Sequence, residues 1–204
     1  MSVFPLLLSR KHLLAAAFAS LGAACLVSGT GCSSPAAATP TKTTAASDDP
    51  VHDFDGFFGS WHVRHRKLKD RLAGSHEWLE FEGSQTMQPV LGGSGNMTDN
   101  VFNMPDGSIQ RGVTLRAFDP KTGKWSIWWL DGNRPSKIDV PVVGGFEKGS
   151  GAFYADDTFN GKPIKVRFLW VNVTPNQREW QQAFSPDDGK TWETNWIAYF
   201  TRKG

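Results

Sequence analysis

Closely spaced turn signals are the feature that most constrains the fold of this chain. Past Pro50, clusters of Gly, Pro, Asn and Asp recur about every 8–14 residues, and the runs between them are rich in β-branched and aromatic residues. Connections this short join antiparallel neighbours and leave no room for the crossover that parallel strands need. The pattern therefore predicts an all-β fold with no helix longer than a turn or two.

The predicted strands form a single antiparallel up-and-down meander of about ten strands, preceded by a short helical turn over residues 53–58. A barrel is the expected closure, because it removes the exposed edges that otherwise pair with other chains. The strands are predicted at residues 59–68, 77–91 (broken at Gly83), 96–104, 109–118, 124–130, 137–147, 151–160, 163–173, 178–184 and 191–202.

A Gly-x-Trp motif, Gly59 to Trp61, opens the first predicted strand. It resembles the start of lipocalins and related calycin barrels, which often place an arginine of the last strand over this tryptophan; Arg202 stands at that place. The segments RGVTLRAFDP (111–120) and GKTWETNW (189–196) resemble an uncharacterised bacterial family among the calycins. The resemblance covers nearly the whole predicted barrel. It implies a calycin-like (lipocalin and fatty-acid-binding-protein-like) fold with no assigned activity.

The first 32 residues have the pattern of an export signal. Arg10 and Lys11 precede an apolar run of 15 residues, 13–27, which is shorter than the about 20 residues of a membrane-spanning helix. Cys32 follows small residues and resembles the lipidated cysteine of a bacterial lipoprotein, with glycine where such sites usually have leucine. We expect an envelope protein, periplasmic or on the outer membrane, whose lipid anchor is its only membrane contact. Plain secretion after cleavage near residues 36–38 is the alternative.

Residues 33–50 are rich in Ala, Thr, Pro and Ser, and they predict a flexible linker. Residues 51–204 then form one barrel domain. Both cysteines, Cys25 and Cys32, precede this domain, so it has no disulfide and no thiolate ligand. All but two of the 22 Lys and Arg residues follow residue 32, where 20 Asp and Glu residues balance them. A nucleic-acid partner, which requires a basic excess, is therefore not expected.

The segment SPDDGKTW (185–192) matches the Asp-box pattern and resembles the repeated hairpins of sialidases. The match implies turn chemistry, in which Ser185 and Asp187 accept hydrogen bonds from turn amides, Gly189 takes a positive φ and Trp192 packs under the hairpin. A sialidase propeller requires several hundred residues and several such boxes. In this short domain, a single box predicts the hairpin that joins the last two strands.

Nine tryptophans indicate a barrel that binds a small hydrophobic or amphipathic ligand in its interior. Arg116 and Arg167 lie inside predicted strands, where either could bind a carboxylate or other anionic head group. Alternation does not decide which of them points inward, because both faces of their strands are partly apolar. The predicted ligand-binding residues are His65, Arg116, Trp128, Arg167 and Trp196.

His62 and His65 point to opposite faces of a predicted strand, so they cannot share a metal ion. No metal and no cofactor are expected, with haem ligation by His65 as an alternative. A second hypothesis is a small barrel hydrolase or isomerase that uses His65 with an acid such as Glu80. A third is a structural or interaction domain. The basic run 64–71 is interpreted as a charged strand end that resists edge pairing.

Overall fold

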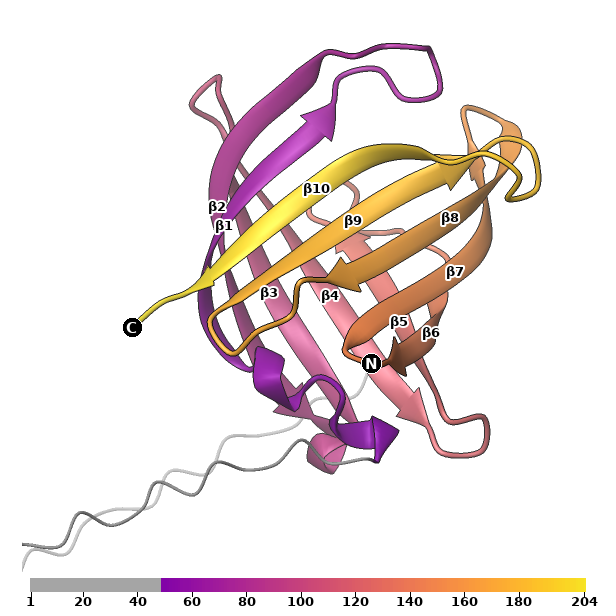
Figure 1. The fold of residues 1–204 in the computed structure, drawn as a ribbon. Coiled ribbons are helices and arrows are strands. Elements are labelled where there is room, and N and C mark those ends of the chain that lie inside the picture. Colours follow the sequence, from indigo (N-terminus) through magenta and orange to yellow (C-terminus); the bar gives the residue numbers. More distant parts are fainter. Residues whose placement is uncertain (1–48) are drawn as a thin grey trace, which may run out of the picture. The chain divides into compact units, whose positions relative to one another are not determined.

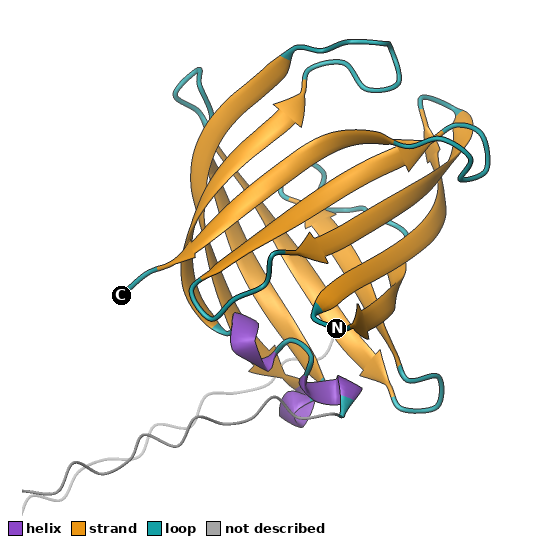
Figure 2. Cartoon of the chain, viewed as in Figure 1, coloured by secondary structure: helices purple, strands orange, loops and turns teal. Residues whose placement is uncertain are grey.

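The computed structural model describes residues 49–204, which form ten antiparallel strands and three short 3₁₀ helices (Figures 1 and 2). The strands are β1 (Gly59–Leu68), β2 (Trp78–Val90), β3 (Gly95–Asn103), β4 (Ile109–Asp119), β5 (Lys124–Asp131), β6 (Val142–Glu147), β7 (Ser150–Phe159), β8 (Lys162–Val171), β9 (Gln177–Ser185) and β10 (Glu193–Arg202). The 3₁₀ helices are η1 (Pro50–His52), η2 (Asp55–Phe57) and η3 (Leu91–Gly93).

The strands close into an up-and-down barrel, as the sequence predicts. Each strand pairs with its neighbours in the chain, and β1 pairs with β10, from Trp61 opposite Arg202 to Lys67 opposite Trp196. Closure leaves no free edge in the sheet, and two short 3₁₀ helices precede the first strand where a helical turn is expected.

Alternation along each strand separates the barrel interior from its outer surface. In β1, Trp61, Val63 and His65 are buried, whereas His62 and Arg64 are exposed. The side chains of β1 that point inward are therefore the odd-numbered ones, which include Lys67.

The η1–η2 segment plugs one end of the barrel, and the long loops lie at the other end (Figure 1). Phe54 is fully buried and makes edge-on contacts with Phe57, Trp125 and Phe146, with ring centroids 5.0–5.1 Å apart. The indole nitrogen of Trp125 donates a hydrogen bond to the carbonyl of Pro50 at 2.8 Å. Aromatic packing and this bond fix the plug, so aromatic side chains fill the closed end.

The predicted arrangement of Trp61 and Arg202 is confirmed. The Arg202 guanidinium lies 4.2 Å from the centre of the Trp61 ring, a cation–π distance. Arg202 also donates to the carbonyls of Gly56 and Phe58, and Trp61 Nε1 donates to Phe57 O at 2.9 Å. These bonds attach the η2 segment to the first and last strands.

Two predicted strand details are wrong. Strand β2 is not broken at Gly83, which pairs in register with Val63 and Phe102. A Cβ there would lie 2.2 Å from Val101 O, so glycine permits a close approach of the strands. The predicted strand 137–147 is ordered as strand only from Val142, with one isolated bridge at Ile138. Pro141 explains this end, because proline has no N–H to give to the ladder.

The SPDDGKTW segment forms the hairpin between β9 and β10, as predicted. Ser185 Oγ accepts from Gly189 N at 2.8 Å, and Asp187 accepts from the amide and hydroxyl of Thr191 at 2.8 and 2.7 Å. These bonds lower the pKa of Asp187 to about 2. Gly189 has a φ of +85°, and Trp192 Nε1 donates to Gly189 O. The motif is a structural turn.

The predicted signal segment 1–32, its Cys32 anchor and most of the linker 33–50 lie outside the described residues. Pro50, the last residue of the predicted linker, already belongs to η1. Within residues 49–204, no helix has the length and apolarity to cross a membrane.

Candidate functional site

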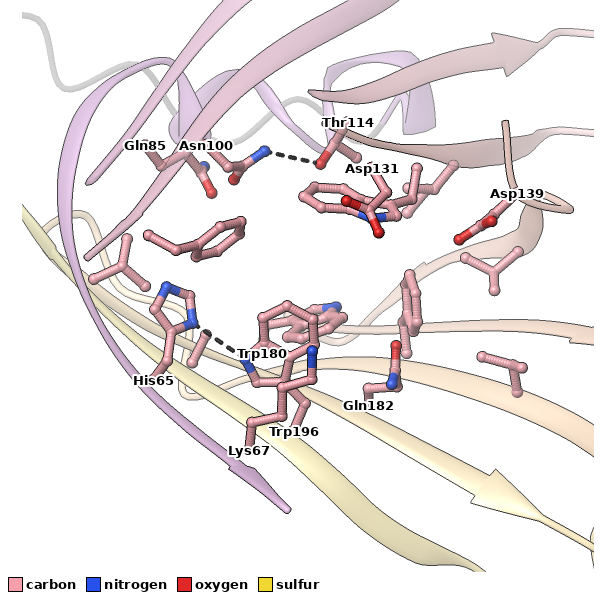
Figure 3. Close-up of a pocket in the computed structure, with 18 of the residues that line it drawn as sticks. His65, Lys67, Gln85, Asn100, Thr114, Asp131, Asp139, Trp180, Gln182 and Trp196 are labelled. Carbon is pink, nitrogen blue, oxygen red and sulfur yellow. Dashed lines mark hydrogen bonds between the residues drawn. The ribbon is translucent and has the colours of Figure 1, made fainter. Parts of the chain in front are cut away.

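The barrel encloses a cavity of about 260 Å³ that runs from above the plug toward the opposite end (Figure 3). A barrel of eight strands is about filled by its own side chains, and additional strands leave interior space. Side chains of β1, β9 and β10 (among them His65, Trp180 and Trp196) face those of β2, β3 and β4 (Gln85, Asn100 and Thr114) across this space. The interior is hollow at the height of these residues.

Most of the cavity wall is apolar. It is lined by aromatic side chains from five strands, namely Phe102, Trp129, Phe168, Trp180 and Trp196, with aliphatic residues between them. Trp180 and Trp196 contact each other edge-on at 5.7 Å, and Phe168 packs on Trp180 at 4.9 Å. Such packed rings form a rigid surface that suits the apolar body of a ligand.

Arg116 is the charged residue at the closed end of the cavity. It is 4% exposed, and its guanidinium lies 5.1 Å from the ring of Phe54 in the plug. Its Nη1 donates to Asn96 Oδ1 at 3.1 Å and to Thr98 Oγ1 at 2.8 Å. Both acceptors are neutral, and no carboxylate within residues 49–204 lies at salt-bridge distance from Arg116.

Two buried hydrogen-bond donors here have no partner within the described residues: Nε of the Arg116 guanidinium itself and Nδ2 of its neighbour Asn96. Burial lowers the pKa of Arg116 to about 9, which leaves it charged at neutral pH. Burying a charge without a counter-ion costs several kcal/mol. The closed end of the cavity therefore carries a positive charge that no carboxylate of the described residues compensates.

His65 lies higher in the cavity as a neutral imidazole. Trp196 Nε1 donates to His65 Nδ1 at 3.2 Å, which places the ring proton on Nε2. Burial, with the charges of Lys67 and His62, lowers the pKa of His65 to about 3. His65 therefore contributes an uncharged polar edge within an aromatic wall.

Haem does not fit at His65. Its ring stacks on Phe81 at 4.8 Å and meets Phe102 edge-on at 5.1 Å, so aromatic side chains occupy the space around it. Nδ1 is engaged by Trp196, and Nε2 lies 3.5 Å from the place of a Cβ on Gly83, against the barrel wall. Neither nitrogen faces a space that a porphyrin could enter.

The open end of the cavity carries charges of both signs. Lys67 at the end of β1, Asp131 at the end of β5 and Asp157 near the end of β7 line it, together with loop residues Arg71, Arg134 and Asp139. Arg134 Nε lies 3.4 Å from Asp131 Oδ2, and its Nη2 lies 3.8 Å from Asp139 Oδ1. This mouth is polar and solvated, in contrast to the wall below it.

The structure brings together three of the five predicted ligand-binding residues. His65, Arg116 and Trp196 line the cavity, whereas Trp128 and Arg167 are absent from its wall. Trp128 lies on the outer surface opposite Leu115, because its neighbours Ile127 and Trp129 take the inward positions of β5. Arg167 is also outside, with its guanidinium 4.5 Å from the ring of Trp192.

Sequence reasoning missed several lining residues, above all Lys67, Trp129 and Trp180. A signal was present for Lys67, which follows His65 by two residues and so shares its face. It was present for Trp129 too, because Trp125 and Ile127 form an entirely apolar face with it.

The pairing of His65 with Glu80, given as an example in the hydrolase or isomerase hypothesis, fails on geometry. Glu80 pairs with Arg66 on the outer surface at 3.0 Å, so it cannot meet the inward-pointing His65. His62 likewise bonds Glu82 outside, at 3.1 Å. Within residues 49–204, no cluster of three or more potential metal ligands occurs.

Comparison with known proteins identifies the fold and no closer relationship. No protein family and no curated protein matches the sequence. The S-type phycobiliprotein lyase CpeS from Guillardia theta has a similar structure, with a TM-score of 0.51 and 12% identity over 74% of this chain and 90% of that chain. The designed barrel EF1p2_mFAP2b, solved with DFHBI, has a TM-score of 0.40 and 11% identity over 76% of this chain and 99% of that chain. The likeness shows the fold alone, a ten-stranded up-and-down barrel, and the resemblance to the calycins and to one bacterial family among them stays a prediction.

Proposed function

We propose that this barrel binds a small amphipathic ligand whose anionic head group contacts Arg116. The observation that carries the proposal is a buried guanidinium, without a carboxylate partner, at the closed end of an apolar cavity. The apolar body of the ligand packs against Trp129, Trp180 and Trp196, and polar groups near the mouth remain in water.

A ligand anion is the charged acceptor that the groups of residues 49–204 do not offer to Arg116. Arg116, which lines the cavity, and Asn96, its hydrogen-bond partner on the neighbouring strand, each keep one donor, Nε and Nδ2, without a partner among the described residues. A carboxylate accepts from a guanidinium in charge-assisted hydrogen bonds, which are stronger than neutral ones. Only a bound anion then offsets the free-energy cost of burying the Arg116 charge. Binding is therefore selective for anions.

The cavity volume limits the size of this ligand. About 260 Å³ lies at the lower end of the range for small-molecule sites, roughly 300–1,000 Å³. A medium-chain carboxylate or a small aromatic acid therefore matches the site better than a long lipid.

A titration of the full-length protein with decanoate tests this function, with quenching of tryptophan fluorescence as the measure of binding. Arg116→Met should weaken decanoate binding about 10- to 100-fold, since a hydrogen bond to a charged group contributes about 1.5–3 kcal/mol. Arg167→Met is the matched control, because it removes an arginine from the outer surface and should leave the affinity unchanged.

Titration with decanol in the same assay distinguishes the contribution of the charged head group to the affinity from that of the apolar tail. It keeps the apolar body without the charge, so we expect it to bind weakly to the wild type and equally well to Arg116→Met. Equal decanoate affinities for the wild type and the Arg116 variant would contradict the proposed function.

We also infer an envelope location with a lipid on Cys32, motivated by the export-signal pattern of residues 1–32. Expression in a bacterium fed with radiolabelled palmitate should label the wild-type chain and leave Cys32→Ser unlabelled. Equal labelling of the two chains, or none on the wild type, would exclude the anchor.

A further inference from the structure

Lys67 is a lysine inside the cavity that the proposed carboxylate site does not use. It is the second-last residue of β1 and follows His65 by two positions. Its side chain points into the barrel beside Trp196 (Figure 3). Arg116 lies at the plugged end of the cavity and Lys67 at the open end, so the two cations serve different parts of a bound molecule.

The surroundings of Lys67 are aromatic on one side and charged on the other. Its Nζ lies 4.1 Å from the centre of the Trp196 ring. Within residues 49–204, it forms no ion pair and no hydrogen bond with a carboxylate. The titratable and charged groups that line the same space are His65, Arg71, Arg111, Arg116, Asp131, Arg134, Asp139 and Asp157.

These surroundings change the protonation of the amine. Burial, and then the charge of Arg71, lower the pKa of Lys67 to about 8, against the opposing effect of Asp131. About half of the side chain is then uncharged at pH 8, compared with less than about 1% of an ordinary lysine. An uncharged lysine amine in an apolar pocket is a nucleophile toward carbonyl groups.

We propose that Lys67 is a covalent attachment site, where its Nζ forms an imine with the carbonyl carbon of a small apolar or aromatic aldehyde. The nitrogen lone pair forms the C–N bond, and the carbonyl oxygen takes up protons and leaves as water, so the net reaction is amine plus aldehyde to imine plus water. No oxidant or reductant takes part. The negative charge of Asp131 at the mouth stabilises the iminium that results from protonation.

The wall of the cavity selects the aldehyde. Phe102, Trp129 and Trp196 line the space around Lys67 and offer rings but few hydrogen-bond partners. An aromatic aldehyde gains contact area there and orients its carbonyl toward the mouth, where Nζ lies. A sugar-like hydroxyaldehyde would have to bury hydroxyl groups without partners, which disfavours it.

Reductive trapping on the full-length protein tests this site. The protein is incubated with benzaldehyde and cyanoborohydride at pH 8, and modified lysines are quantified by peptide mass spectrometry. We expect Lys67 to be modified about tenfold faster than Lys165, because far more of its amine is uncharged. Lys165 is the internal control, since Asp156 and Asp188 hold its ammonium at 2.7 and 3.1 Å on the outer surface.

Two comparisons complete the test. Lys67→Arg keeps the charge beside Trp196 and should lose the dominant adduct, because a guanidinium is not nucleophilic under these conditions. Glycolaldehyde should show a smaller preference for Lys67 than benzaldehyde does, because it has no ring to pack against the aromatic wall. Modification of Lys67 no faster than Lys165, or an equal preference with glycolaldehyde, would overturn the proposal. The imine does not involve Arg116, so this result is independent of the carboxylate assay.

Discussion

Arg116 and Arg167 lie in strands of similar composition, and the direction of each side chain decides its role. Arg116 points inward to the neutral acceptors Asn96 and Thr98, where its charge is uncompensated. Arg167 points outward onto the Trp192 ring. At the scale of the residue, the functional hypothesis therefore rests on one buried side chain whose environment no outer-surface position reproduces.

His65 should make the stability of the protein depend on pH. Its pKa is about 3 in the folded state and about 6.5 in an unfolded chain, so the unfolded state binds more protons between these values. Stability is fully present above pH 6.5 and falls as the pH decreases toward 3. From pH 7 to pH 4 we expect a loss on the order of 3 kcal/mol from this residue alone.

Urea unfolding of the wild type and of His65→Gln at both pH values measures this effect. Glutamine keeps an acceptor for Trp196 Nε1 but does not titrate, so the variant should lose less stability at pH 4. Identical pH dependence of the two proteins would show that His65 is not buried as a neutral ring.

At the scale of the element, Gly112 in β4 sets the position of the Trp129 ring. A Cβ on Gly112 would lie 2.2 Å from two atoms of that ring, which lines the cavity. Gly112→Ala should therefore push the indole into the space that a ligand needs. Overfilling a packed interior costs about 1–3 kcal/mol of folding stability. The displaced ring should also lower the decanoate affinity in the fluorescence titration.

Gly145→Ala in β6 is the matched control for this change. A Cβ on Gly145 meets no atom within 4 Å, so its affinity should equal that of the wild type. If Gly112→Ala bound decanoate as tightly as Gly145→Ala, the ring of Trp129 would not border the ligand site.

Turn chemistry made the elements predictable from the sequence. Asp187 and Gly189 define a hairpin by local bonds alone, and the first strand begins and ends where its flanking residues indicate. The exceptions also have local causes: Pro141 shortens β6, and Gly83 continues β2 because two strands approach closely there. The sequence does not distinguish a glycine that breaks a strand from a glycine that permits a close contact between strands. Only the observed strand pairing distinguishes the two.

The candidate site was predictable in part. His65 shares its face with Trp61 and Val63, and its inward direction follows from that pattern. Trp128 and Arg167 required a choice between two partly apolar faces. Polar neighbours at two-residue spacing, Ser126 for Trp128 and Lys165 for Arg167, mark both faces as outer ones.

At the scale of the whole molecule, the sequence pattern indicates closure but not the hollow interior. Strand number and the pairing of β1 with β10 follow from short turns and the need to cover edges. The volume of the cavity depends on how inward-pointing rings from different strands pack at each level along the barrel axis. That packing is set by contacts between strands and not by the sequence of any one strand. Trp180 and Trp196, for example, meet across the β9–β10 pair at 5.7 Å.

The central claim is that a hollow barrel binds an anionic amphiphile through Arg116. Native mass spectrometry of the full-length protein with decanoate tests it most directly, with the Arg116→Met and Arg167→Met variants measured in parallel. We predict one decanoate per chain on the wild type and on Arg167→Met, and a much smaller bound fraction on Arg116→Met at the same decanoate concentration. A wild-type chain that retains no decanoate, or equal retention by all three proteins, would contradict the claim.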